Sequence, residues 1–185
     1  MDIEQTKIDG ARIIKPDVFG DERGWFMEPY QTQRYFEAGI TDEFVQDNLS
    51  HSKGGVLRGF HYQFNNPQSQ LIYVSLGEIF FVLLDVRRGS PTFGEWVSTT
   101  LSADNYQQFY MTPGLASAFC VMSESANVHY KVNRLYEPSV EGGVLWSDPA
   151  LGVDWPLEDP IVIKRDAGLP KLADISDDRL PPHRP

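Results

Sequence analysis

The chain has 185 residues, of which 41% are hydrophobic and 23% are charged, and its formal net charge at pH 7 is −10. These values suit one globular domain that can bury a sizeable core, and the negative charge argues against nucleic acid as a partner because phosphate binding needs a basic face. The single cysteine, Cys120, excludes an intrachain disulfide and a zinc site built from cysteines.

Short strands are predicted along most of the chain, because runs rich in Val, Ile, Phe and Tyr alternate with Gly, Pro, Asn, Asp and Ser. The predicted strands cover residues 11–19, 55–63, 70–76, 78–87, 96–101, 107–113 and 126–136. Gly77 in SLGEI predicts a tight turn between two of them. One short helix is predicted within residues 32–40, with Gly39 as its terminator.

This pattern predicts an all-β fold of the jelly-roll type, a sandwich or barrel with a few short helices. We expect a single domain over residues 1–185, with an extended C-terminal tail over about 166–185, where the sequence is polar and rich in proline. The segment MDIEQTKIDG lacks the apolar core of a signal peptide, and no window approaches ~18 apolar residues. We therefore expect a cytoplasmic protein with no membrane partner.

The segment GGVLRGFHYQ, residues 54–63, places Arg58 and His61 inside an apolar strand. An arginine is rarely buried without a partner, so the two residues together indicate a polar cavity that accepts an anion. Residues three apart point to opposite faces of a strand, so both can reach one cavity only if Gly59 bends or bulges it. A histidine alone in a strand is more often structural and held by one hydrogen bond.

A metal site is the first alternative use of His61. Residues 55–61 fit the first half of the G-x5-H-x-H pattern of many cupins, but Gln63 stands where the second histidine belongs. The other three histidines have no ligand spacing, and a first-row metal needs three or four ligands in a defined geometry. We therefore expect no metal.

Acid–base chemistry is the second alternative. Histidine titrates near neutrality and becomes a good general base when a carboxylate fixes its tautomer. Asp166 in KRDAGLP can supply that carboxylate, and Tyr130 or Tyr136 in HYKVNRLY can supply a proton from across a cavity. A tyrosine in a strand is more commonly structural, so Tyr130 can also be a core or edge-strand aromatic residue. Composition alone does not choose among these candidate residues.

The segment FVQDNLSHSKGGVLRGFHYQ closely resembles the signature of the dTDP-4-dehydrorhamnose 3,5-epimerase family. Six further segments resemble blocks of that family in the same order, namely DERGWFME, RRGSPTFGEW, MTPGLASAF, YKVNRLYEP, GGVLWSDPALGVDWP and IVIKRDAGLP. The resemblance covers nearly the whole chain.

This resemblance implies a cupin-type homodimer that epimerises a nucleotide-linked 4-keto-6-deoxy sugar, with no metal or organic cofactor, in deoxysugar and cell-surface polysaccharide biosynthesis. It implies that His61 is the base, that Asp166 orients it, and that Tyr130 is the acid on the opposite face. The positions that it implies for substrate binding are Arg23, Phe26, Glu28, Gln46, Asn48, Arg58, Gln70, Ser117, Tyr136 and Arg165.

Two residues depart from the family's pattern, because Gln70 stands where the family usually has lysine and Ser117 where it has histidine. Both changes remove a potential positive charge near the enolate oxygen, which can cost on the order of 10²-fold in rate. Two alternatives therefore stay open. One is an epimerase of a single centre, C3 or C5, acting on a CDP- or GDP-linked sugar, a heptose or a dideoxy sugar. The other is a cupin that binds a sugar nucleotide without turnover.

Overall fold

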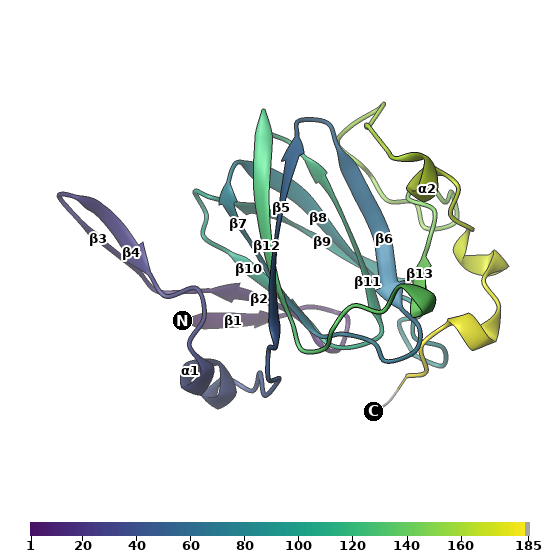
Figure 1. The fold of residues 1–185 in the computed structure, drawn as a ribbon, viewed down its shortest axis with the longest axis horizontal. Coiled ribbons are helices and arrows are strands. Elements are labelled where there is room, and N and C mark those ends of the chain that lie inside the picture. The colour runs from purple at the N-terminus through teal and green to yellow at the C-terminus, as the bar shows by residue number, and fades with distance from the viewer. Residues whose placement is uncertain (184–185) are drawn as a thin grey trace.

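Two antiparallel sheets pack face to face in the computed structural model, which describes residues 1–183 (Figure 1). The six-stranded sheet has the order β1-β2-β10-β7-β12-β5, and the five-stranded sheet has the order β13-β6-β11-β8-β9. A separate hairpin consists of β3 and β4. The strands are β1 (Asp2–Gln5), β2 (Ala11–Lys15), β3 (Val18–Asp21), β4 (Gly24–Met27), β5 (Gln46–Lys53), β6 (Leu57–Gln63), β7 (Gln70–Leu76), β8 (Glu78–Asp85), β9 (Trp96–Ser102), β10 (Gln108–Met111), β11 (Leu115–Val121), β12 (Ser125–Val132) and β13 (Glu141–Gly143).

Helices are few and short, as the sequence predicts. They are α1 (Thr32–Glu37), α2 (Lys164–Ala167) and the 3-10 turns η1 (Pro138–Val140), η2 (Leu172–Asp174) and η3 (Asp177–Arg179). None of the helices within residues 1–183 has the length and apolar character needed to cross a membrane. The two sheets and the few short helices confirm the all-β jelly-roll prediction.

The predicted strands are present, most of them with limits shifted by one or two residues and two of them with larger differences. Pro16 divides the run predicted at 11–19 into β2 and β3, because proline lacks the N–H that a strand ladder needs. The last predicted strand ends at Val132 instead of 136. Gly39 ends α1 with a φ of 80°, and Gly77 turns the chain between β7 and β8 with a φ of 75°.

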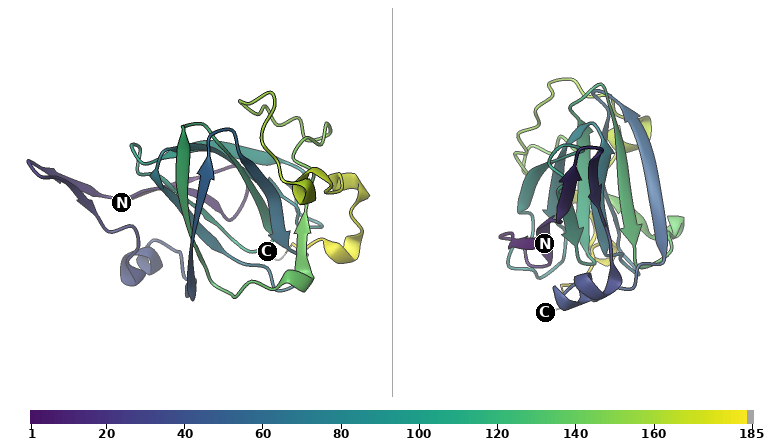
Figure 2. Two further views of the ribbon diagram at one scale, coloured as in Figure 1. Left: turned by 45° about the horizontal axis from the view of Figure 1, so that its top comes forward. Right: turned by 90° about the vertical axis from the view of Figure 1, so that its left-hand side faces the viewer.

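The core lies between the two sheets, and a second apolar layer lies outside the five-stranded sheet. Alternate residues of β8 belong to the two layers, since Phe81 and Leu83 pack inward while Val82 and Leu84 pack outward. The outer layer is covered by the C-terminal segment, which buries Leu172 and Leu180. The right-hand view of Figure 2 shows the sheets edge on, as separate layers.

The C-terminal segment is therefore more structured than the extended tail expected over about 166–185. It contains α2 and two 3-10 turns, and it is fixed at its end by hydrogen bonds between Arg88 and both Pro181 and His183. Arg184 and Pro185 lie outside the described residues. This segment matters for the site because it carries Asp166 back to the middle of β6.

Candidate active site

A cavity of about 420 Å³ opens between the two sheets. Its walls combine buried apolar side chains, among them Ile72 and Phe81, with polar ones. The residues expected to act on substrate that line it are Gln46, Asn48, Arg58, His61, Gln70, Ser117, Tyr130, Tyr136 and Arg165.

A bulge at Gly59 brings Arg58 and His61 into this one cavity. These two residues are three apart on β6, yet they pair with Phe119 and Ser117, which are only two apart on β11. Gly59 has a φ of 107°, and a Cβ added there would collide with the Ser117 carbonyl oxygen. The predicted bend is therefore confirmed, and only glycine fits at its centre.

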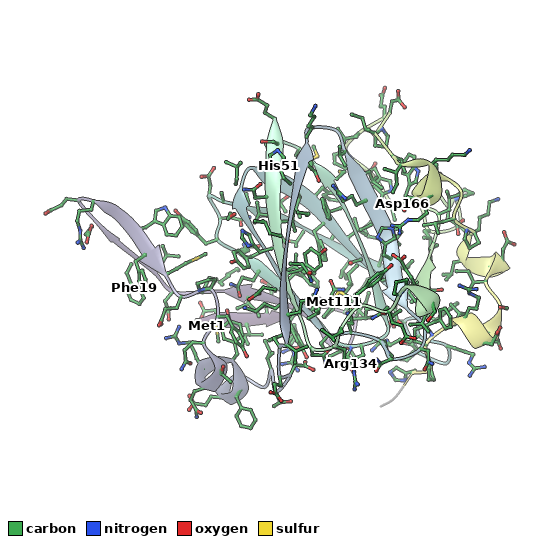
Figure 3. The ribbon with its side chains drawn as sticks, viewed as in Figure 1. Met1, Phe19, His51, Met111, Arg134 and Asp166 are labelled. Atoms are coloured by element: carbon green, nitrogen blue, oxygen red, sulfur yellow. The ribbon has the colours of Figure 1, made fainter. Side chains whose placement is uncertain are left out.

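His61 and Asp166 form a hydrogen-bonded pair inside the cavity wall. The imidazole Nε2 lies 2.9 Å from Asp166 Oδ1, and the Gly59 N–H donates to Asp166 Oδ2 at 3.3 Å. The Asp166 side chain is 1% exposed, whereas that of His61 is 30% exposed. Figure 3 shows Asp166 on α2, beside β6. His61 thus faces the cavity, and the buried Asp166 holds its imidazole from the other side.

The environment of Asp166 keeps its carboxyl group ionised. Burial by itself raises the pKa of Asp166, but hydrogen bonds from His61, Gly59 and Arg165, together with the charge of His61, outweigh it and lower the pKa to about 2. An ionised carboxylate only accepts hydrogen bonds, so Nε2 of His61 carries the proton between them. The other ring nitrogen, Nδ1, is then left to take a proton, which is the tautomer that a general base needs.

Tyr130 lies on the opposite wall. It belongs to β12 of the six-stranded sheet, between Asn48 of β5 and Ile72 of β7 in register. His61 belongs to β6 of the five-stranded sheet. The two candidate proton-transfer groups therefore approach the cavity from different sheets.

The polar residues of β5 line the same cavity. Gln46, Asn48 and Ser50 face it from alternate positions of the strand, and the next one, Ser52, accepts a hydrogen bond from Arg58 Nε at 3.0 Å. The Arg58 side chain is exposed at the cavity rim and is not buried as its position in an apolar run suggested. A guanidinium at such a rim suits a phosphate group.

Three expected substrate-binding residues lie elsewhere in the chain. Arg23 and Phe26 are on the β3–β4 hairpin, which projects from the sandwich, and Glu28 follows it (Figure 1). Arg23 pairs with Asp21, and Glu28 pairs with Arg34 at 2.6 Å. Figure 3 shows Phe19, on the same hairpin, at the opposite end of the molecule from Asp166. One chain alone does not bring these three residues to the cavity.

Glu141 is a cavity residue that the sequence did not single out. It lies on β13 and accepts hydrogen bonds from Tyr136 Oη at 2.7 Å and from Arg165 Nη1 at 3.1 Å. The only signal in the sequence is its place directly before GGVLWSDPALGVDWP, and no spacing argument links it to Arg165. Within residues 1–183, no group of three or more His, Cys, Asp or Glu side chains is placed to hold a metal ion.

A family model described as dTDP-4-dehydrorhamnose 3,5-epimerase matches residues 5–174. The dTDP-4-dehydrorhamnose 3,5-epimerase of Shigella flexneri is 44% identical over 176 residues, which are 94% of this chain and 97% of that protein. The chain belongs to this family. Its members are epimerases, so the protein is an isomerase of nucleotide-linked sugars.

Two further relatives bear on the site. The structure of the dTDP-6-deoxy-D-glucose-3,5-epimerase of Legionella pneumophila, in complex with dTDP-4-keto-L-rhamnose, has 45% identity and a TM-score of 0.96, and the match covers 100% of this chain and 99% of that one. The dTDP-4-dehydrorhamnose 3-epimerase of Streptomyces niveus is 36% identical over 185 residues, which are 98% of this chain and 89% of that protein. The relatives thus include enzymes named for two centres and for one.

Proposed function

We propose that this protein inverts C3 and C5 of a dTDP-linked 4-keto-6-deoxy sugar, with His61 as base and Tyr130 as acid. The observation that carries the proposal is their placement on opposing sheets of one cavity, with Asp166 2.9 Å behind the base. A sugar ring held between the sheets presents one face to each group. Proton removal from one face and return to the other is the requirement for inversion.

The step is a proton transfer in each direction. His61 takes the proton from a carbon next to the ketone, and the C–H electron pair forms a carbon–carbon double bond while the carbonyl electron pair moves to oxygen. The enolate then takes the hydroxyl proton of Tyr130 on the opposite face of that carbon, and the ketone reforms. Exchange with solvent returns His61 to its neutral form and protonates the tyrosinate. Asp166 stabilises the imidazolium that forms in between.

Arg58, Gln46 and Asn48 support binding of the nucleotide end of the substrate. They share the polar part of the cavity with the candidate base, and Arg58 offers paired N–H donors at its rim. Guanidinium groups bind phosphate oxygens through two parallel hydrogen bonds, which suits a diphosphate.

We also propose that the active form is a homodimer in which the β3–β4 hairpin of one copy reaches the other copy. Its aromatic residues support this, because Phe19, Trp25 and Phe26 are 60%, 56% and 62% exposed. An isolated two-stranded hairpin is marginal in water and exposed aromatic groups of this size favour a partner surface. The hairpin carries Arg23, which the resemblance assigns to the substrate and which is remote from the cavity of its own chain.

Mixing two inactive variants tests the dimer. Arg23→Ala removes the hairpin contribution, and His61→Ala removes the base. If each active site combines a hairpin and a base from different copies, half of the dimers formed on co-expression are mixed and each mixed dimer has one intact site, so about a quarter of the specific activity is expected to return. No recovery, together with a monomeric mass by analytical ultracentrifugation, would contradict the homodimer.

Deuterium exchange tests the chemistry. Incubation with dTDP-4-keto-6-deoxyglucose in D2O, read by NMR, is expected to show deuterium at C3 and C5 with inversion. His61→Ala is expected to abolish exchange because no enolate forms. Tyr130→Phe keeps the ring and loses the acidic hydroxyl, so exchange with retained configuration is expected. If Tyr130→Phe inverts the sugar at the wild-type rate, another group is the acid, and Tyr136 is the next candidate.

A single-centre epimerase is the second candidate function, and it rests on Gln70 and Ser117. Both residues line the cavity where the family usually has lysine and histidine, so the enolate oxygen meets neutral groups in this chain. The 3-epimerase from Streptomyces niveus shows that the family includes enzymes named for one centre. Deuterium at C3 alone would support this candidate. Tight binding without exchange at either carbon would contradict both candidates.

A further inference from the structure

The guanidinium group of Arg165 contacts both His61 and Asp166, and it also contacts Glu141. Arg165 Nε donates to Asp166 Oδ1 at 3.0 Å, and its Nη1 lies 3.1 Å from Glu141 Oε2. Its Nη2 lies 3.0 Å from Nε2 of His61. All three nitrogens of the group are therefore directed to protein atoms of the site, although the resemblance assigned Arg165 to the substrate.

The contact between Arg165 and His61 is not a hydrogen bond in the tautomer that the base requires. Nε2 carries its proton toward Asp166, and a guanidinium can only donate, so the two N–H groups face each other. What remains is the electrostatic effect of the Arg165 charge on the protonation of the ring. A cation 3.0 Å from the ring opposes formation of the imidazolium, whereas the Asp166 carboxylate at 2.9 Å favours it.

Glu141 offsets the charge of Arg165. Its two carboxylate oxygens lie 3.1 and 3.3 Å from Arg165 Nη1, and the hydroxyl of Tyr136 holds one of them at 2.7 Å. β13 places Glu141 beside β6, where Glu141 pairs with Gln63 and Gly143 pairs with His61. The position of Arg165 is thereby fixed from two elements, α2 and β13.

The other groups around His61 do not duplicate this arrangement. Asp174 and Arg179 line a second pocket with His61, where Arg179 donates to the backbone carbonyl oxygen of Glu141 at 3.3 Å. Arg58 lies on the same strand but its guanidinium Nε donates to Ser52, and Tyr130 lines the cavity from the other sheet. Tyr62 shares the wall with His61, and its hydroxyl donates to the Arg179 carbonyl oxygen. None of these has a hydrogen-bond contact with the imidazole among the described residues.

We propose that Arg165 and Glu141 are positioning residues for the His61–Asp166 pair: Arg165 holds the pair in place and its charge opposes protonation of the imidazole, and Glu141 limits that effect. The proposal rests on the epimerase function proposed for this site. It differs from a substrate-binding role in what it predicts for KM, and it differs from a purely structural role in what it predicts for pH dependence.

The test compares variants that change charge with little change in shape, assayed with the dTDP-linked 4-keto sugar. Arg165→Gln is expected to lower kcat about tenfold, because the orientation of the base is loosened, and to leave KM within about twofold. The acid-side midpoint of the kcat/KM profile is expected to move up by about half a pH unit, the small size reflecting solvent screening of this half-exposed group. Glu141→Gln is expected to move the same midpoint down.

Two further variants separate charge from geometry. Arg165→Lys keeps the charge but loses the planar fork, so the midpoint stays near that of the wild type while kcat falls. The double variant Arg165→Gln with Glu141→Gln removes both charges, and its midpoint is expected to return toward the wild-type value. Lys164→Gln is the matched control, because it removes a positive charge from the adjacent exposed position of α2, and neither kcat nor the midpoint is expected to change.

Titration of the His61 ring by NMR in the absence of substrate gives a readout that does not depend on turnover. The signal is assigned by its loss in His61→Gln, and its midpoint is expected to move in the same directions as the kinetic one. Failure of the wild-type enzyme to exchange deuterium would contradict the proposed function and leave this titration readable. A higher KM in Arg165→Gln with an unmoved ring titration would overturn the proposal and return Arg165 to substrate binding.

Discussion

Replacing Asp166 by asparagine tests whether its ionised form stabilises the fold as the geometry indicates. The pKa of this carboxyl group is lowered from 3.8 to about 2, since its bonds to His61, Gly59 and Arg165 outweigh the burial that raises it. The fall from 3.8 to about 2 corresponds to about 2.5 kcal/mol of stability, which asparagine cannot supply because it carries no charge. We therefore expect Asp166→Asn to lower the free energy of unfolding by about 2.5 kcal/mol at pH 5.

The pH dependence gives this prediction its sign. A carboxyl group whose pKa is lower in the folded state contributes stability above its unfolded pKa and loses it as the pH falls through the folded value. The gap between wild type and Asp166→Asn is expected to be full at pH 5, about half as large at pH 3, and close to zero below pH 2. Urea unfolding at intervals between pH 3 and pH 6 measures it.

Asp159→Asn serves as the control, because this aspartate is exposed and lies outside the site. Its unfolding curve is expected to follow that of the wild type at every pH. A gap for Asp166→Asn that stays constant from pH 6 to pH 3 would refute the reasoning, since it would show that a lost contact, and not a lost charge, causes the destabilisation.

Three other substitutions address the strand, the binding end and the reacting end of the cavity. Gly59→Ala is expected to lower stability by about 3 kcal/mol, seen as a lower Tm, because its Cβ would lie 2.8 Å from Ala118 Cα at a φ of 107°; a Tm within one degree of wild type would contradict the bulge. Arg58→Ala is expected to weaken dTDP binding about tenfold or more by calorimetry with the fold intact, and unchanged affinity would place the diphosphate elsewhere. Gln70→Lys is expected to raise kcat about tenfold if a missing positive charge limits enolate formation, whereas a lower kcat would show that the cavity suits glutamine.

The sequence predicted most of the sheet because burial and strand propensity agree there. β5 and β11 were not predicted, each for a different reason. In β5 the inward positions hold Gln46, Asn48 and Ser50, since they line a polar cavity, so the usual alternation of apolar residues is missing. In β11 small residues dominate LASAFCV, which lowers the strand signal although the strand is central and mostly buried.

The sequence predicted those site residues that are unusual in their local segment. It did not predict those whose role depends on residues that only the fold brings together. His61 and Arg58 stood out as polar residues in an apolar strand, and the need for a bend at Gly59 followed from strand parity alone. Glu141 gave no such signal, because its importance comes from a neighbour 24 residues away that the fold brings to it. The distance of Arg23 from the cavity was equally invisible, because local sequence does not say where a hairpin points.

The C-terminal segment has a consequence for how activity develops over time. His61 and Asp166 are 105 residues apart in sequence, and the segment that carries Asp166 also seals the outer apolar layer with Leu172 and Leu180. The C-terminal segment docks on the outer face of β6, β8 and β11, which exists only once these strands have paired, so the His61–Asp166 contact is expected to form late. A chain whose two sheets have already paired, but whose end has not yet docked, would bind nucleotide through β5 and Arg58 without a functional base. Nucleotide binding is therefore expected to return before catalysis when the protein refolds from urea.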